Sequence, residues 1–182
     1  STAQSKLRQG VTMELLGNCG FSLCAPLNKY TKEDFDSWIS EYTDTFDITW
    51  SDFGGYIAAS KKAKATINLA FQVGHGTLRA SVMGYEDRTP SADELDKMKN
   101  LAGECLDAGA LGLSTGLVYS PGTYSRTDEL ISIAEEVSKR NKLYSTHQRD
   151  EGNDSVGLYV SLNEAIEIGR RYFQIYKITD ED

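Results

Sequence analysis

Apolar residues in this chain form short runs that end at glycine or polar residues, and these runs predict strands. The five predicted strands are residues 12–16, 66–73, 110–114, 143–146 and 173–178. Between them, apolar residues recur every three or four positions, which is the spacing of one helix face. Strands that alternate with helices pair in parallel through right-handed crossovers. The pattern therefore predicts an α/β protein with a parallel β-sheet, either open and doubly wound or part of a (β/α)8 TIM barrel.

Capping residues mark where helices are expected to begin. Two Ser-x-x-Glu capping boxes, at 91–94 and 161–164, precede apolar residues at helical spacing. Gly109 is placed to end the helix that follows the first box, because glycine is favoured just beyond a helix. Further helices are predicted to begin near Thr31, Ser51 and Thr127.

Length and charge limit the classes of partner. A chain of 182 residues fits one domain, 1–182, with a hydrophobic core. The net charge of 19 − 27 = −8 argues against nucleic acid and anionic membranes, because both attract basic surfaces. No apolar run approaches the roughly 20 residues of a membrane span, and no signal-peptide pattern is expected from the first residues. A small anionic substrate remains compatible, because it needs only one or two local arginines.

Few residues are available as metal ligands. The cysteines are Cys19, Cys24 and Cys105, and the histidines are His75 and His147. An odd number of cysteines without a dense pattern predicts reduced thiols, and hence a cytoplasmic location. Cys105 lies on the apolar face of a predicted helix, so it and Cys24 are interpreted as structural.

Cys19 and His147 each follow a predicted strand. If the strands are parallel, both side chains project from the rim where α/β proteins carry their chemistry. Thiolate and imidazole are zinc ligands, so the pair predicts half of a metal site. The alternatives are a small buried cysteine beside a structural histidine, or a metal-free Cys19–His147 dyad.

Three other side chains are weaker candidates for substrate binding. Arg79 and Arg149 have the geometry to bind a carboxylate through two hydrogen bonds, and bracing of a loop is the alternative for each. Tyr119 is a candidate donor to a substrate carbonyl, with packing as the alternative. Its loop contains neither a Walker lysine nor a GxGxxG spacing, which argues against a nucleotide. His75, between two glycines, is interpreted as bracing a loop.

Several segments carry a family resemblance when taken in order. They are residues 10–22, which contain Gly-Asn-Cys-Gly, and residues 73–79, 82–84, 109–119 and 144–151. Together they resemble the N-acyl-D-amino-acid deacylases (D-aminoacylases) of the amidohydrolase superfamily, from about residue 8 to about residue 171. Agreement of several segments is more specific than one motif, and it favours the metal interpretation of Cys19 and His147.

The resemblance implies a zinc-dependent enzyme on a distorted (β/α)8 barrel, which hydrolyses the amide bond of N-acyl-D-amino acids. It implies that Cys19 is a thiolate ligand, that His147 is an imidazole ligand, and that Tyr119 lies in the substrate pocket. The segment covered corresponds to about strands two to six of the barrel.

The chain departs from the family pattern at three points. The expected His-x-His pair of the first barrel strand and the catalytic aspartate near the end of the barrel fall outside residues 1–182, and Lys177 stands where another histidine is expected. Three protein ligands are usual even in catalytic zinc sites. We therefore expect this chain to be incomplete and nearly inactive alone.

Two alternatives to this enzyme remain. One is a non-catalytic α/β domain that binds a small ligand or a protein, and the other is an amidohydrolase of different specificity. Because a partial barrel exposes two sheet edges, self-association is also expected.

Overall fold

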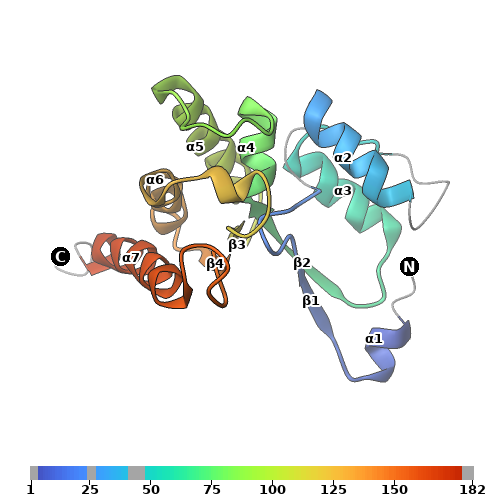
Figure 1. Ribbon diagram of the computed structural model, residues 1–182. Helices are drawn as coiled ribbons and strands as arrows, with labels where there is room; N and C mark the ends of the chain where they lie inside the picture. The colour runs from blue at the N-terminus through green and yellow to red at the C-terminus, as the bar shows by residue number, and fades with distance from the viewer. Residues whose placement is uncertain (1–3, 24–27, 41–47, 178–182) are drawn as a thin grey trace.

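Four parallel strands form one sheet in the order β1–β2–β3–β4 (Figure 1). They are β1 (Met13–Leu16), β2 (Asn68–Gly74), β3 (Gly112–Gly116) and β4 (Leu143–His147). The structure, a computed structural model, describes residues 4–23, 28–40 and 48–177. Strands that are consecutive in sequence are neighbours in the sheet, so the strand order has no reversal of the kind that defines a doubly wound fold. The sheet curls into half of a barrel, which confirms the predicted α/β partial barrel.

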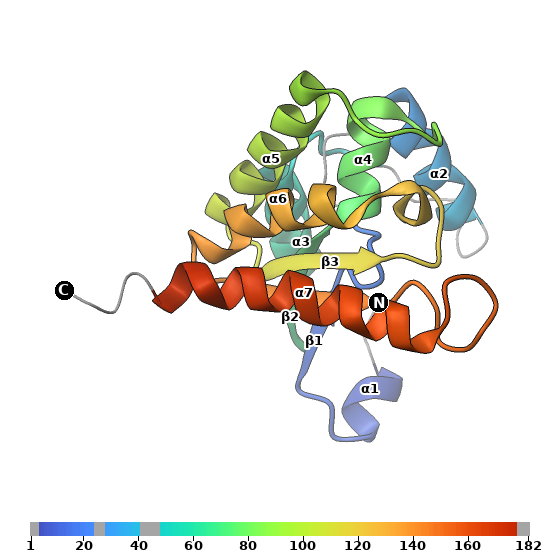
Figure 2. The same cartoon turned by 60° about the vertical axis from the view of Figure 1, so that its left-hand side comes forward.

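Seven α-helices accompany the sheet within the described residues. They are α1 (Gln4–Arg8), α2 (Lys29–Ser40), α3 (Phe53–Ala63), α4 (His75–Met83), α5 (Ala92–Asp107), α6 (Thr127–Ser138) and α7 (Leu158–Lys177), with a short 3₁₀ helix at Gly122–Tyr124. Figure 2 shows α4, α5 and α6 gathered on the same side of β3. No helix within the described ranges is long and apolar enough to cross a membrane.

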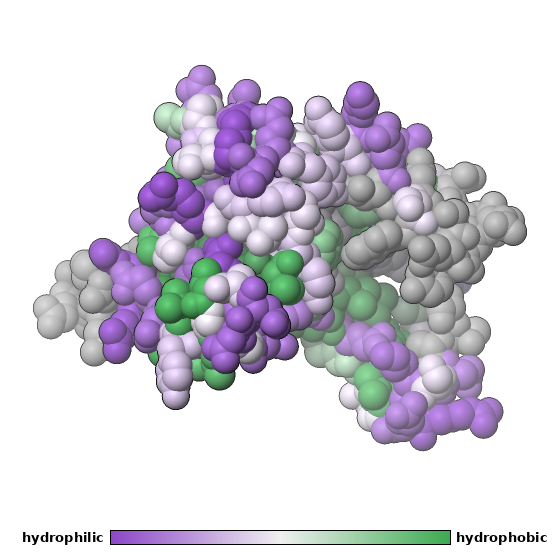
Figure 3. Space-filling model, in the orientation of Figure 1, coloured by the Kyte–Doolittle hydropathy of each residue, from purple (hydrophilic) through white to green (hydrophobic). Residues whose placement is uncertain are grey.

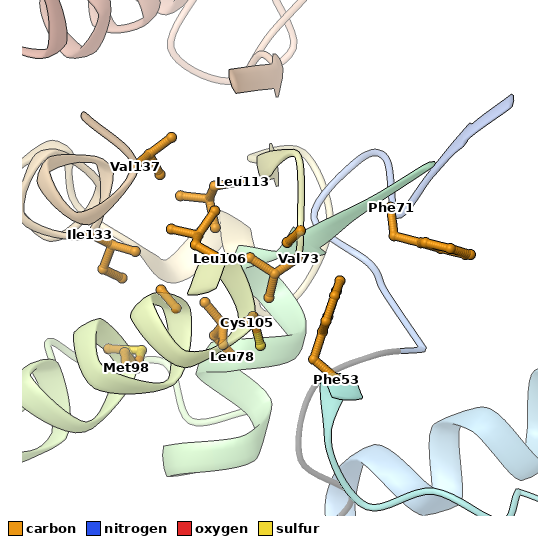
Figure 4. Packing of buried hydrophobic residues seen from close by; sticks show 12 residues of the cluster. Phe53, Phe71, Val73, Leu78, Met98, Cys105, Leu106, Leu113, Ile133 and Val137 are labelled. Carbon is orange, nitrogen blue, oxygen red and sulfur yellow. The ribbon is translucent and has the colours of Figure 1, made fainter. Parts of the chain in front are cut away.

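The hydrophobic core lies between the sheet and helices α4, α5 and α6 (Figure 4). Val73 of β2 and Leu113 of β3 point into it, and each is almost fully buried. The predicted apolar face of α5 is confirmed, since Met98 and Ala102 are fully buried and Cys105 nearly so. The opposite face of the strands is left for polar side chains.

The first capping box forms as predicted, and the strands begin within two residues of expectation. Ser91 Oγ accepts the Glu94 N–H, while the Glu94 carboxylate accepts the Ser91 N–H. Strand β3 begins and ends two residues later in the chain than the predicted strand 110–114. The displacement arises because the Ala110 N–H still donates to Cys105 O, which keeps residue 110 in the turn that ends α5.

The predicted fifth strand, 173–178, is wrong where the structure describes it. Residues up to Lys177 belong to helix α7, and residue 178 lies outside the described range. Ile168 of this helix is fully buried beside Leu130 and Ala134 of α6. Extending an established helix adds one hydrogen bond per residue, which outweighs the modest strand preference of Phe, Ile and Tyr.

The second predicted capping box, 161–164, is also wrong. Helix α7 begins before it, at Leu158, and Ser161 is buried within the helix. Ser161 Oγ accepts the backbone N–H of Asp150, and the Glu164 carboxylate binds Arg149. The two polar side chains thus hold the loop that follows β4 instead of capping a helix. Cys24 lies outside the described residues.

Candidate metal centre and its rim

The loop that follows β1 meets the ends of β3 and β4 at Gly116. Gly116 of β3 pairs in register with His147 of β4. On its other side, a Cβ added to Gly116 would lie 2.0 Å from the carbonyl oxygen of Cys19. The segments that carry Cys19 and His147 therefore flank one glycine, and the structure places both predicted metal ligands at the same rim.

The Cys19 loop is held by a strand that is not its sequence neighbour. Cys19 has a φ of +54°, the left-handed conformation, in a Gly-Asn-Cys-Gly turn. The Gly20 N–H donates to Ser114 Oγ at 3.1 Å, and that hydroxyl donates to Gly17 O. Ser114 of β3 therefore closes the loop that follows β1. This role for Ser114 is absent from the sequence analysis, because no local pattern reveals a contact between residues 94 positions apart.

The first turn of α4 holds the same loop from the other side. The Thr77 N–H donates to Gly20 O at 3.1 Å, and the Ser22 N–H donates to Thr77 Oγ1 at 3.0 Å. Ser22 Oγ in turn accepts the Gly74 N–H at 2.9 Å. The Gly74 and Thr77 N–H groups are among those that a helix leaves unpaired at its start. Together the three bonds fix the backbone that follows Cys19.

One aromatic side chain packs on His147. The Tyr119 ring stands perpendicular to the imidazole, with 5.0 Å between ring centroids. Phe21 lies 5.8 Å from Tyr119 on the side of the Cys19 loop. His147 Nε2 is 3.5 Å from Glu151 Oε1, a carboxylate that is largely exposed. Cys19, Tyr119 and His147 thus gather at one rim, as predicted from their positions after strands.

Arg79 lies away from this rim in a buried ion pair. Its guanidinium donates to the Glu129 carboxylate at 2.7 Å and to the carbonyl oxygens of Glu86 and Arg88. Arg79 is fully buried. These contacts favour the bracing role over substrate binding. His75 occupies the first turn of α4, not a rim loop, and its Nε2 is 2.9 Å from Glu129 Oε1.

The charge state of Glu129 follows from its two partners. Burial alone would raise the pKa of the Glu129 carboxyl, but the hydrogen bond and charge of His75 and the charge of Arg79 lower it below its usual value. The carboxylate therefore stays ionised inside the protein, where it joins α4 to α6.

Arg149 is likewise bound to other groups within the protein. It donates to both carboxylate oxygens of Glu164 at 2.9 Å, and to the carbonyl oxygens of Thr123 and Ser125. These bonds join α7 to the loop after β3 and favour the bracing role. Next to it, the Asp150 carboxylate accepts backbone N–H groups of the following loop, from Gly152 and others.

The donor set at the rim matches zinc in type but not in number. A thiol and an imidazole suit zinc, whose sites usually have at least three protein ligands. Within the part of the chain that the structure describes, no cluster of three or more His, Cys, Asp or Glu could hold a metal ion. Cys19 and His147 therefore fit as two ligands of a site that needs more.

The sequence of this chain is similar to those of known deacylases. No protein-family model matches the chain. A D-aminoacylase from Alcaligenes xylosoxydans xylosoxydans is 36% identical over 165 residues, which cover 91% of this chain and 33% of that protein. An N-acyl-D-glutamate deacylase from the same organism is 34% identical over 167 residues, which are 91% of this chain and 32% of that protein.

Solved structures agree with the sequence relatives. A D-aminoacylase crystal structure, described as defining a subset of amidohydrolases, matches with a TM-score of 0.77 and 36% identity over 92% of this chain and 34% of its own. An N-acyl-D-glutamate deacylase from Bordetella bronchiseptica, complexed with zinc and a phosphonate inhibitor, matches with a TM-score of 0.74 and 31% identity, covering 91% and 33%. These similarities confirm the resemblance inferred from the sequence. The chain spans about a third of the length of the relatives it matches.

Proposed function

We propose that this chain, which is homologous to N-acyl-D-amino-acid deacylases over 91% of its length, is a barrel segment of a zinc-dependent amidohydrolase of that kind. The proposed reaction is hydrolysis of the amide bond of N-acyl-D-amino acids. The observation that carries the proposal is the position of Cys19 and His147 on the two sides of Gly116.

Each rim residue has a proposed role. Cys19 binds zinc as a thiolate and His147 binds it through a ring nitrogen, while further ligands come from outside the described residues. Zinc, when bound, supplies Lewis-acid chemistry that polarises the acyl carbonyl and activates water. Tyr119 donates a hydrogen bond to the substrate carbonyl in this proposal, which its exposure of 41% and its ring contact with His147 support.

The proposed substrate class is taken from the relatives. Their identities to this chain do not favour one N-acyl-D-amino acid over another. The D-aminoacylase, the N-acyl-D-glutamate deacylase and the N-acyl-D-aspartate deacylase are 36%, 34% and 35% identical to this chain. Because these values are nearly equal, we propose the shared class of N-acyl-D-amino acids and no single side chain. We also propose a cytoplasmic location, on the basis of the odd number of cysteines without a dense pattern in the sequence.

One observation favours a second candidate, a non-catalytic domain that binds a small ligand or a protein. This observation is the lack of a third ligand near Cys19 and His147 among the described residues. On either proposal, we expect the 182-residue chain alone to hydrolyse N-acetyl-D-amino acids little or not at all.

Metal content per chain separates the two candidates. The protein is purified without added zinc, beside Cys19→Ser, His147→Ala and the control Cys105→Ala, and zinc is measured by elemental analysis. Near-stoichiometric zinc that is lost in the first two variants and kept in the control supports the amidohydrolase. Absence of zinc from the unmodified chain shows that Cys19 and His147 do not bind zinc without further ligands, and it favours the binding domain for this chain. Zinc-dependent turnover of N-acetyl-D-amino acids by the chain alone would show that the expected inactivity is wrong.

A further inference from the structure

We propose that Gln72 is a positioning residue that sets the separation of the segments carrying Cys19 and His147. The inference rests on the proposed metal roles of those two residues. Gln72 lies on β2, it is 1% exposed, and neither the sequence pattern nor the family resemblance singles it out.

The Gln72 side-chain amide bridges the two segments directly. Its Nε2 donates to Asn18 Oδ1 at 3.0 Å, and its Oε1 accepts from Ser145 Oγ at 3.0 Å. Asn18 immediately precedes Cys19, and Ser145 lies two residues before His147 on the same strand. One amide therefore joins the residues next to both proposed ligands.

The bridge spans a strand that lies between its two ends. Strands β2 and β4 both pair with β3 and not with each other. At the register position of Gln72, β3 has Gly112, which has no side chain, so the path between β2 and β4 stays open on this face. Val73, the next residue, enters the hydrophobic core, so Gln72 points to the face opposite to the helices.

The ends of the bridge are themselves fixed. The Asn18 side-chain amide donates to Leu15 O at 2.8 Å, which orients its oxygen towards Gln72. Ser145 is held in strand β4 by its pairing with Ser114 of β3. A change at Gln72 therefore acts on the position of Cys19 relative to His147.

A structural role alone is a weak explanation for a buried glutamine here. Buried strands of parallel sheets are normally filled by Val, Ile or Leu, and burial of an amide is costly unless both ends are hydrogen-bonded. The pairing of β2 and β4 with β3 already joins these strands. What the amide adds is a side-chain bridge between the turn that carries Cys19 and strand β4, beside the hydrogen bonds that Ser114 makes to the same turn.

Zinc affinity of the full chain tests this role. Affinity is measured by competition with a chromophoric chelator, and Co²⁺ absorption reports thiolate ligation and coordination geometry. The variants are Gln72→Met, which keeps the length but loses both hydrogen bonds, and Ser145→Ala, which removes one end. Gln9→Met, at an exposed position in the turn after α1, is the matched control.

We expect Gln72→Met to weaken zinc binding by about 10-fold to 100-fold, the usual range for residues that orient metal ligands. Ser145→Ala should weaken it less, Gln9→Met should not change it, and the Co²⁺ spectrum should shift in Gln72→Met. A merely structural role would lower the stability of the fold and leave the zinc affinity and the Co²⁺ spectrum of Gln72→Met unchanged, and that result overturns the inference.

The same experiment separates the two proposals. If Cys19→Ser and His147→Ala abolish zinc binding while Gln72→Met binds zinc normally, the positioning role fails and the metal site stands. If Cys19→Ser and His147→Ala leave zinc binding unchanged, the metal site fails and the positioning role fails with it. If circular dichroism shows that Gln72→Met does not fold, Ser145→Ala decides, and unchanged affinity in that variant contradicts the inference.

Discussion

At the scale of single residues, the rim is packed with backbone atoms and tolerates little change. A Cβ on Gly116 would lie 2.0 Å from Cys19 O, and one on Gly74 would lie 2.4 Å from Gly20 O. Backbone atoms held by hydrogen bonds cannot move as the end of a flexible side chain can. The position of Cys19 therefore depends on glycines in two other strands.

Gly116→Ala should destabilise the protein by about 2 kcal/mol or more, because the added methyl overlaps backbone. Gly169→Ala is the control. Its Cβ would meet nothing within 4 Å in helix α7, so it should stabilise by about 0.5 to 1 kcal/mol. Urea unfolding followed by circular dichroism measures both changes. Equal stabilities for the two variants would show that the close approach at Gly116 is relieved at little cost.

Asp150 should control the order of the loop that follows β4. Its backbone hydrogen bonds with Gly152, Gly157 and Ser155 hold the pKa of its carboxyl well below the usual value. The stabilisation is therefore complete above the ordinary aspartate pKa of about 3.9 and is lost as the pH falls through the lower folded value.

Asp150→Asn should lower the hydrogen-exchange protection of amides 152–157 at pH 7. The difference from the unmodified protein should shrink as the pH falls below 4. Asp154→Asn, in the same loop, is the control, because in the structure Asp154 binds Asp150 through its backbone N–H. Protection in Asp150→Asn equal to that in the unmodified protein at pH 7 would contradict this role.

At the scale of elements, a buried ion pair joins two helices that are far apart in sequence. Arg79 of α4 and Glu129 of α6 are separated by 50 residues, and their side chains are 0% and 2% exposed. Removing one member of such a pair leaves an uncompensated charge in the interior, which costs about 3 to 5 kcal/mol.

Glu129→Gln should therefore destabilise the protein by about 3 kcal/mol at pH 7. Because the folded pKa of Glu129 is lowered, its contribution is present above the ordinary glutamate pKa of about 4.3 and is lost as the pH falls below it. The gap between variant and unmodified protein should accordingly narrow in acid. Denaturant unfolding at pH 7 and pH 4 checks both points, with Glu135→Gln on the same helix as the control. A gap that widens in acid would contradict this assignment.

Some elements and site residues were predictable from the sequence, and others depend on contacts that only folding creates. Strands β1, β2 and β4 were predictable because apolar runs end at glycine or polar residues. The Ser161–Glu164 box was misleading because its polar side chains bind Asp150 and Arg149, partners that folding alone brings near. Likewise, Cys19 and His147 were predictable from their places after strands, whereas Ser114 and Gln72 act through contacts that span many residues.

At the scale of the whole molecule, the half-barrel has two edge strands. Within the described residues, β1 pairs only with β2, and β4 only with β3. Figure 3 shows hydrophobic side chains over β1 and β2, where a groove of about 540 Å³ is lined by residues such as Leu16, Ile67 and Leu69. Unpaired edges beside apolar surface favour association with another chain.

We therefore predict that the 182-residue chain self-associates, as sedimentation velocity over a concentration series would show. Leu143→Lys should reduce association, because Leu143 lies on edge strand β4, is 55% exposed, and a lysine there blocks edge pairing. Tyr85→Lys, at a 39% exposed position outside the strands, is the control. A clean monomer at all concentrations would contradict the prediction.

The bonds that hold the Cys19 loop also bear on the order of events during folding. Ser114 binds Gly17 and Gly20 across separations of 97 and 94 residues, so the turn around Cys19 cannot be completed until β3 lies beside β2. Contacts of such long range form late, because the entropy of closing the intervening chain must be overcome first. In a nascent or misfolded chain, Cys19 and His147 would then be far apart and would act only as separate, weak metal ligands. On the metal roles proposed for these residues, zinc binding would therefore follow assembly of the half-barrel.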